Sequence, residues 1–326
     1  MQPIKSLLND NPLPLVLSCP GGDFDVFDWA GEEKQNLREL LSEHGAILFR
    51  DFPINNVADF ERLAEVLTTP DWVEYLEATS PRDPVESKTA TSTKYDKDRT
   101  IFFHNEKSYS RIWPKNLFFY CDRPADKDGE TPLADCRAIY RDLPEHIRAN
   151  FESWHLMYVR CFSNHMGIPW KKAFNVESRQ EMEDYCEHNL IDELSWKSDG
   201  TPVLRYRRNT SILHPLTGDP CWFNHGTFFN VHSLEPDIKA FFLASLGQDG
   251  LPYNTYYGDG EDIAPEDIDL LRGLYEKHST SFAWQQRDVL FIDNMLVAHG
   301  RRPFQGARSI LVTMTEAVDY HDIESF

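Results

Sequence analysis

Residues 288–314 read DVLFIDNMLVAHGRRPFQGARSILVTM and hold two apolar runs on either side of a polar stretch. The runs at 288–293 and 309–318 have the length and the Val, Ile and Leu content of buried strands. His299 follows the turn after the first run, and Arg308 stands at the entry of the second. The segment therefore predicts two core strands with a histidine and an arginine between them.

Further apolar runs bounded by turn residues predict a chain rich in short strands. Expected strands lie at 46–52, 100–106, 116–124, 201–208, 220–224, 230–234 and 281–285. Expected helices, from a helical apolar period, lie at 32–45, 58–67, 137–143, 238–246 and 266–279. This mixture predicts a mainly β fold with α decoration, of the barrel or jelly-roll type. Residues 1–326 contain no repeat or long linker, so we expect a single domain with a largely helical insertion around 145–200.

Composition and charge disfavour several classes of protein. The chain has 326 residues, of which 41% are hydrophobic, and a formal net charge of −20, so a large core is possible and binding to phosphate backbones is disfavoured. Six widely spaced cysteines without a CxxC pair favour reduced thiols. No apolar run is long enough to cross a bilayer, and Pro12 and Pro14 interrupt the one candidate signal core. We expect a cytoplasmic protein that binds neither nucleic acid nor membrane.

His104 and Glu106 stand two residues apart in the expected strand 100–106. Side chains at i and i+2 of a strand point to the same face, so the two would supply adjacent metal ligands. A site of two histidines and one carboxylate leaves positions open on Fe(II) for a co-substrate and O2. Such a pair also occurs on solvated strand faces, so the metal hypothesis needs a third ligand, for which His299 is the candidate.

Arg308 has two interpretations. A cation at the mouth of an apolar strand is costly without an anionic partner. A bound dicarboxylate, gripped by the guanidinium fork, would supply that partner. A structural salt bridge to an acidic side chain of the protein would supply it equally well, and this segment alone does not separate the two.

Four segments together resemble the taurine dioxygenase superfamily, and especially the branch that is similar to clavaminate synthase and to hydroxylases of peptide natural-product pathways. They are HGAILFRDFP (44–53), FFHNEKSY (102–109), GETPLADCR (129–137) and residues 288–314. The segments follow the family's order and span nearly the whole chain. The resemblance implies a double-stranded β-helix, which is a cupin-like variant of the jelly roll, with iron at its open end.

The resemblance also implies a set of site residues and an activity. His104, Glu106 and His299 match the iron ligands, Thr131 matches a hydroxyl that contacts 2-oxoglutarate, and Arg308 matches the residue that binds its distal carboxylate. The implied reaction hydroxylates an unactivated C–H bond of a small molecule such as an amino acid, free or attached to a carrier protein. It consumes O2 and releases succinate and CO2.

The carboxylate ligand departs from the commonest family pattern. Many members carry Asp where this chain has Glu106, whereas Glu occurs in the clavaminate synthase-like branch. Related halogenases carry a small residue there, so a carboxylate argues against halogenation. Three alternatives stay open: a desaturase or cyclase of the same family, a cupin-like metal-dependent hydrolase or lyase, and a non-catalytic member that binds a small ligand.

Several other residues have both a functional and a structural interpretation. Asn224, His225 and Arg301 are candidate substrate contacts, although buried Asn and His are commonly only hydrogen-bonded and charged Arg is commonly solvated. We expect Asn294 to orient the turn before His299 through its side chain. Three aromatic residues are candidates for a lid, although packing is the simpler expectation: Trp154, Trp170 and Trp196.

Overall fold

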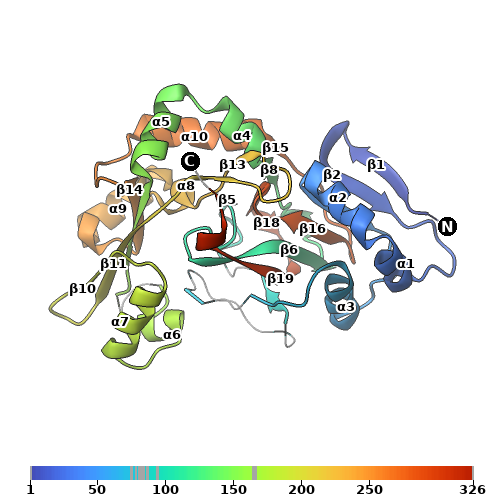
Figure 1. Cartoon of the computed structure of the whole chain (residues 1–326), viewed down its shortest axis with the longest axis horizontal. Helices are drawn as coiled ribbons and strands as arrows, with labels where there is room; N and C mark the ends of the chain where they lie inside the picture. Colours follow the sequence, from blue (N-terminus) through green and yellow to red (C-terminus); the bar gives the residue numbers. More distant parts are fainter. Residues whose placement is uncertain are drawn as a thin grey trace.

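The computed structural model describes residues 2–73, 76–77, 79, 85, 88–92, 95–163 and 167–324. Two β-sheets meet near the middle of the molecule, and most of the helices lie toward its outside (Figure 1). The sequence runs that predict strands supply the inner layers of this arrangement.

The larger sheet contains both apolar runs of the segment 288–314. Neighbouring strands are antiparallel except for β2 and β3, which are parallel. The long strand β6 lies between β16 and β19 and pairs with both. In spatial order the seven strands are β1 (Ile4–Leu8), β2 (Asn11–Ser18), β3 (Ala46–Arg50), β16 (Val289–Asp293), β6 (Ile112–Arg123), β19 (Ser309–Asp319) and β4 (Ala90–Thr91).

Alternation along β6 shows why this sheet needs continuous apolar runs. Phe118 and Tyr120 belong to one hydrophobic core, and Phe118 stacks on Phe291 of β16 with ring centroids 4.2 Å apart. Leu117 and Phe119 point the other way and belong to a second core. A strand covered on both faces has no solvated side chains to interrupt its apolar run. The first face is covered by α1 (Val26–Glu32), α2 (Lys34–His44) and α3 (Val57–Leu67).

The smaller sheet faces the second core. Its four strands in spatial order are β15 (Ser279–Thr280), β8 (Leu133–Asp135), β17 (Val297–Arg301) and β5 (Ile101–His104). The antiparallel pairing of β17 with β5 sets His299 opposite His104. The ring of Phe119 from β6 lies 5.1 Å from the ring of His299, so the two sheets touch at this point. The predicted mainly β core with helices outside is confirmed.

The prediction of a largely helical segment at 145–200 is wrong in part. The segment does contain α5 (Glu145–Trp154), α6 (Trp170–Phe174) and α7 (Arg179–His188). It also contributes β9 (Leu156–Cys161) and β10 (Glu193–Trp196) to a four-stranded sheet with β11 (Pro202–Arg208) and β14 (Tyr253–Tyr257). Strand β9 is not predicted from the sequence because it contains Arg160, and charged residues are rare in buried strands. The Nη1 atom of Arg160 donates to Glu77 at 2.9 Å, and both side chains are buried.

Two expected strands are not strands in the structure. Residues 230–234 instead form the 3-10 helix η1 (Val231–Ser233), because the side chain of Asn230 accepts a hydrogen bond from the backbone N–H of His232 and caps it. Residues 281–285 have no regular structure, and Trp284 turns toward Thr131 instead.

The helices expected at 137–143, 238–246 and 266–279 are found close to where the apolar period places them. They are α4 (Cys136–Asp142), α9 (Pro236–Leu246) and α10 (Pro265–Lys277). The remaining short elements are β7 (Lys127–Asp128), β12 (Ser211–Leu213), β13 (Pro220–Trp222), α8 (Gly226–Phe229), η2 (Gln248–Gly250), β18 (Phe304–Gln305) and η3 (Tyr320–Asp322).

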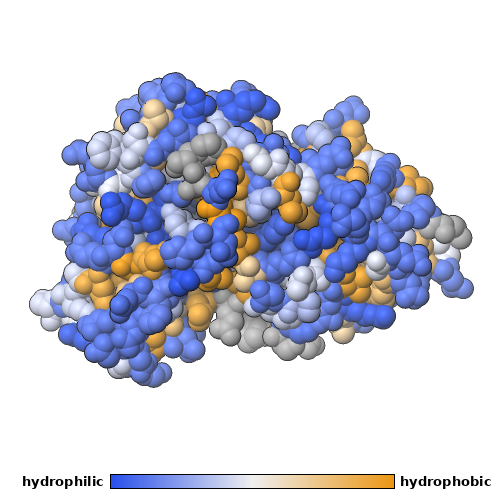
Figure 2. Space-filling model, in the orientation of Figure 1, coloured by the Kyte–Doolittle hydropathy of each residue, from blue (hydrophilic) through white to orange (hydrophobic). Residues whose placement is uncertain are grey.

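The surface agrees with the composition. Figure 2 shows a face that is mostly hydrophilic, as the net charge of −20 leads one to expect. All six cysteines are free thiols. Among the helices of the described residues, none is long and apolar enough to cross a membrane.

Gly45 follows the last residue of α2, and its backbone packs closely against Val297 of the smaller sheet. Its φ of 77° lies in the left-handed region, and an added Cβ would sit 2.5 Å from Cγ2 of Val297. We expect Gly45→Ala to lower the free energy of unfolding by about 2–4 kcal/mol, since it combines backbone strain with overpacking. Urea denaturation measures this change.

Gly273 provides the matched control for Gly45. It lies inside α10, where an added Cβ meets no atom within 4 Å. We expect Gly273→Ala to raise the free energy of unfolding by about 0.5–1 kcal/mol, because alanine is the better helix former. Equal responses of the two variants would contradict this account of Gly45.

Candidate metal centre

Three potential metal ligands converge between the two sheets. One nitrogen each from His104 and His299 and one carboxylate oxygen of Glu106 all lie within 4.8 Å of one another, and all three residues are buried. The ring centroids of the two histidines are 4.4 Å apart. The convergence predicted from the sequence is therefore present, and two imidazoles with one carboxylate are a donor set that suits Fe(II) with open positions.

Backbone geometry orients the first histidine. Nδ1 of His104 lies 2.8 Å from the carbonyl oxygen of Phe102. A carbonyl can only accept a hydrogen bond, so Nδ1 carries the proton and Nε2 presents the lone pair. This arrangement fixes the tautomer that a metal ligand needs.

The expectation that Glu106 lies on the same strand as His104 is wrong. Strand β5 ends at His104, and Glu106 lies in the turn that follows. The side chain reaches the two histidines without strand alternation. Its backbone N–H instead donates to Oδ1 of Asn294 at 2.7 Å. The expectation that the side chain of Asn294 orients the turn before His299 is wrong, because it contacts Glu106 and Pro114 across the site, and the side chain of Asp293 holds the turn.

A narrow cleft of about 40 Å³ contains the three ligands and continues to two arginines. Its walls come from both sheets, with Phe119, Ile310 and Val312 from the larger one. A second cavity shares Ser92, Ile310 and the two arginines, Arg301 and Arg308, with this cleft. The two hollows adjoin, so the ligand cluster and the arginines form one continuous site.

Arg308 has hydrogen bonds but no carboxylate partner among the described residues. Its Nε atom donates to the carbonyl of Gly129 at 2.9 Å, and Nη2 donates to Oγ1 of Thr131 at 3.3 Å. Burial, followed by the charge of nearby Arg301, lowers the pKa of Arg308 to about 10. The structural salt bridge considered for Arg308 is therefore not found in the described chain, and the guanidinium keeps donors for an anion.

Thr131 lies beside this guanidinium and is buried. Its Oγ1 atom accepts hydrogen bonds from Nε1 of Trp284 at 3.1 Å and from Arg308. With both acceptor positions used, the hydroxyl proton is available as a donor. The sequence patterns did not single out Trp284, because a tryptophan in an apolar run suggests packing and carries no mark of a polar contact.

Arg301 lines the same cleft but is held by the backbone. Nη1 donates to the carbonyl of Tyr95 at 3.1 Å, and Nη2 donates to the carbonyls of Asp96 and Arg99 at 2.5 and 2.9 Å. Burial lowers the pKa of Arg301. Arg302 points elsewhere and pairs with Glu276, at 3.0 Å from Nη1 to Oε1.

His225 packs behind a ligand and does not line the cleft. Its ring lies 5.0 Å from the ring of His104, and its Nδ1 atom donates to the carbonyl of Asn105 at 3.1 Å. Burial, followed by the charge of His104, lowers the pKa of His225 well below its usual value, so the ring is neutral at neutral pH.

The interpretation of Asn224 as a substrate contact is not supported by its position. Its Nδ2 atom donates to the carbonyl of Thr210 at 3.1 Å, and its Oδ1 atom accepts from the N–H of Gly226 at 2.9 Å. Both ends of the amide are used to hold the turn before α8. The residues that line the metal cleft do not include Asn224.

The three candidate lid tryptophans do not line the metal cleft either. Trp170 and Trp196 pack edge to face with centroids 5.4 Å apart, and Arg179 lies over the Trp196 ring. Trp154 is half exposed at the end of α5. Packing and surface positions account for all three.

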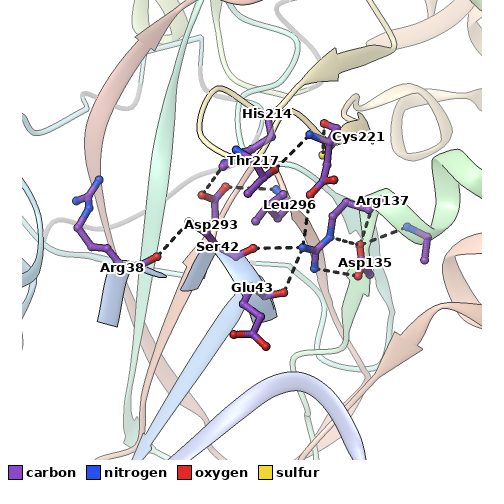
Figure 3. Close-up of polar contacts among 12 residues, drawn as sticks. Arg38, Ser42, Glu43, Asp135, Arg137, His214, Thr217, Cys221, Asp293 and Leu296 are labelled. Carbon is purple, nitrogen blue, oxygen red and sulfur yellow. Dashed lines mark hydrogen bonds and ion pairs between the residues drawn. The ribbon is translucent and has the colours of Figure 1, made fainter. Parts of the chain in front are cut away.

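A second cluster of polar side chains lies behind β17 and was not foreseen. Figure 3 shows His214 beside Asp293, with Nε2 and Oδ2 3.1 Å apart and both side chains buried. Oδ1 of Asp293 accepts from the N–H groups of Met295 and Leu296. These contacts are internal to the protein, and neither His214 nor Asp293 lines the metal cleft.

The sequence of the chain matches a known protein family. The profile of the taurine catabolism dioxygenase family, TauD/TfdA, matches residues 9–315. The chain belongs to this family. The match includes every residue of the ligand cluster and both sheets except β1 and the end of β19, so it concerns the whole site.

Two relatives cover almost the whole chain. The dapdiamide synthesis protein DdaC of Enterobacter agglomerans is 37% identical over 315 residues, which are 97% of this chain and 94% of that protein. A clavaminate synthase-like protein of Arabidopsis thaliana is 28% identical and covers 96% of both chains. The branch that the sequence resembles is thus represented among its relatives.

The fold is also similar to that of a solved structure. AAD-2, whose structure is a complex with Mn(II) and N-oxalylglycine, superposes with a TM-score of 0.54 at 15% identity and covers 98% of this chain and 99% of its own. The predicted jelly-roll class is therefore confirmed. The TauD/TfdA protein described here is an Fe(II)- and 2-oxoglutarate-dependent oxygenase, whose further substrates are a small molecule and O2.

Asn224→Ala separates a structural from a substrate role. The substitution leaves a buried carbonyl and a buried N–H without partners, so we expect the free energy of unfolding to fall by at least about 2 kcal/mol. Affinity for 2-oxoglutarate, measured on metal-loaded folded protein, should not change. A stable variant with a raised KM for the oxidised substrate would return Asn224 to the binding site.

Proposed function

We propose that this enzyme hydroxylates an unactivated C–H bond of a small molecule such as an amino acid, either free or tethered to a carrier protein. The observation that carries the proposal is one continuous cleft with a two-histidine, one-carboxylate cluster at one end and Arg308 at the other, where no carboxylate of the described residues pairs with it. A dicarboxylate is the ligand that fits both ends, since one end offers a metal site and the other a guanidinium.

Each residue of the cleft has a role in this proposal. His104, Glu106 and His299 would hold Fe(II), which together with 2-oxoglutarate and O2 supplies the oxidising chemistry when bound. Arg308 would bind the distal carboxylate, and the Thr131 hydroxyl would donate a hydrogen bond to the same carboxylate. The apolar wall of Phe119, Ile310 and Val312 would exclude water from the space between them.

The substrate would occupy the cavity that adjoins the metal cleft. The volume of that cavity, about 420 Å³, is in the range of small-molecule sites. The name of the relative DdaC refers to dapdiamide synthesis, which favours a substrate derived from amino acids. The carrier-tethered form and a cytoplasmic location for a single-domain protein belong to the same proposal, and the six free thiols agree with a reducing compartment.

The direct test supplies an amino-acid panel, free and carrier-bound, to the Fe(II)-loaded enzyme with 2-oxoglutarate and O2. Hydroxylation predicts succinate in step with a product that has gained one oxygen atom. Loss of two hydrogen atoms would point to the desaturase or cyclase instead. A metal-dependent hydrolase or lyase would form no succinate at all.

Glu106→Ala tests the ligand cluster. Removing the charged ligand leaves two neutral imidazoles, so we expect metal binding at micromolar concentrations and succinate formation both to be lost. Anaerobic titration with Fe(II) or Co(II) measures the first effect, and a coupled succinate assay measures the second. Full turnover by this variant would remove Glu106 from the metal site.

Arg308→Ala tests the co-substrate end of the cleft. Loss of a charge-assisted bidentate contact in a partly desolvated site is worth about 2–5 kcal/mol, so affinity for 2-oxoglutarate should fall by about thirty-fold or more. Arg308→Lys should lie between, because it keeps the charge and loses the fork. Anaerobic titration of 2-oxoglutarate into Fe(II)-loaded protein, followed by the metal-to-ligand charge-transfer band, gives both affinities.

Arg302→Ala is the matched control for Arg308. It removes a guanidinium that is near Arg308 in the sequence but is already paired with Glu276 outside the cleft. Its affinity for 2-oxoglutarate should stay within about twofold of wild type, a difference below about 0.5 kcal/mol. A binding curve that is unchanged in Arg308→Ala, or equally weakened in both variants, would contradict the assignment of Arg308.

A further inference from the structure

The carboxylate ligand stands outside the ladder that holds the two histidines. His299 and His104 are directly opposite one another in β17 and β5, whereas Glu106 follows the last residue of β5. Among the described residues, the ladder of β5 with β17 pairs His104 and Ile101 and does not extend to residue 106. A carboxylate on a short turn needs another support if it is to stay within reach of the imidazole nitrogens.

The side chain of Asn294 supplies that support through three hydrogen bonds. Its Oδ1 atom accepts from the N–H of Glu106 at 2.7 Å. Its Nδ2 atom donates to the carbonyl of Glu106 at 3.0 Å and to the carbonyl of Pro114 at 2.8 Å. Two carbonyls can be satisfied only by the NH2 end, so the orientation of the amide is determined. Asn294 thus pairs with Glu106 as a neighbouring strand would.

The reverse contact comes from the residue next to the ligand. Nδ2 of Asn105 donates to the backbone carbonyl of Asn294 at 2.7 Å. Both asparagines are fully buried. Two segments that are far apart in the sequence therefore exchange direct amide contacts in both directions.

Asn294 is itself fixed by the residues around it. Its N–H donates to the carbonyl of Lys115 at 2.8 Å. The Asp293 carboxylate stabilises the turn by accepting hydrogen bonds from the N–H groups of Met295 and Leu296. His214 in turn contacts the other oxygen of this carboxylate (Figure 3). The same turn leads directly into β17, which carries His299. A single rigid turn is therefore connected to two of the three metal ligands.

We propose that Asn294 is a positioning residue for the metal centre, which fixes the place of the Glu106 carboxylate relative to His299. This inference rests on the proposed metal role of Glu106 and adds a residue that does not touch the metal. Asn294 acts by tying the Glu106 backbone to the turn that begins β17. Loss of such a supporting contact typically weakens metal affinity by about 10–100-fold.

The test measures Co(II) affinity anaerobically on purified full-length protein, with Co(II) as a spectroscopic substitute for Fe(II). We expect Asn294→Ala to bind Co(II) about 10–100-fold more weakly than wild type, at a temperature where circular dichroism shows it to be folded. Asn294→Ser is the second variant, since it is small and retains one hydroxyl in the turn. The d–d absorption of bound Co(II) reports the ligand geometry independently of turnover.

Asn230→Ala is the matched control. Asn230 is also buried, accepts from the N–H of His232 and donates to the carbonyl of Thr255, but it does not line the metal cleft. It should lose thermal stability to a similar degree while its Co(II) affinity stays within about twofold of wild type. A merely structural role for Asn294 would make the two variants behave alike.

A double-mutant cycle shows whether Asn294 acts through Glu106. In the Glu106→Ala background, Asn294→Ala should cause no further loss of Co(II) affinity. If Glu106→Ala itself leaves Co(II) binding unchanged, the proposed metal site fails. If Glu106→Ala weakens binding but the Asn294 variants bind as wild type, or the two losses add independently, only the positioning role is overturned. Failure of both Asn294 variants to fold would likewise overturn it, since Asn294 would then serve the fold alone.

Discussion

The antiparallel pairing of β5 with β17 is the constraint on which the rest of the site depends. Residues directly opposite in such a ladder lie about 4.5–5.5 Å apart between Cα atoms, and this spacing brings two imidazoles into contact without flexible linkers. Gly300 permits the approach, because a Cβ there would lie 2.7 Å from the carbonyl oxygen of Ile101. The backbone therefore sets the separation of His104 and His299, and the other groups complete an arrangement that is already rigid.

Charge is distributed in opposite ways over the surface and within the cleft. The chain carries a net charge of −20, yet Glu106 is the one acidic residue among those that line the metal cleft in the described chain. Arg301 and Arg308 lie there with lowered pKa values because burial disfavours their charged forms. A dicarboxylate that binds to them recovers part of this cost. Co-substrate binding should then stabilise the folded protein by mass action.

Most of the fold could be predicted because its core strands are buried on both faces. The expected strands at 46–52, 116–124 and 288–293 contain the uninterrupted apolar runs 46–49, 117–121 and 289–292, and each run lies in a strand of the larger sheet. Strand β9 was not predicted because it contains a buried charge, that of Arg160. An ion pair with Glu77 makes this burial possible, and no local sequence pattern shows that contact. The expected strand at 230–234 failed for a local reason, since Asn230 caps a 3-10 turn.

The sequence predicts the candidate metal ligands, but it does not predict the residues that hold them in place. Spacing and resemblance together pointed to His104, Glu106 and His299. Strand alternation, however, gave the wrong reason for the direction of Glu106, whose place depends on an asparagine from a distant turn. Trp284 and Gly129, which contact Thr131 and Arg308, carry no chemical signature of their own. Contacts of this kind follow from tertiary structure and leave no periodic trace in the sequence.

The place of β6 in the larger sheet also has a consequence for synthesis on the ribosome. Both partners of β6, β16 and β19, lie in the last part of the chain, so a strand that contains Phe118, Phe119 and Tyr120 leaves the exit tunnel long before either partner exists. An unpaired apolar strand readily associates with other chains. The central strand of the nascent protein therefore stays without its two neighbours for a long interval, and this part of the sheet forms only after β16 and β19 have left the ribosome.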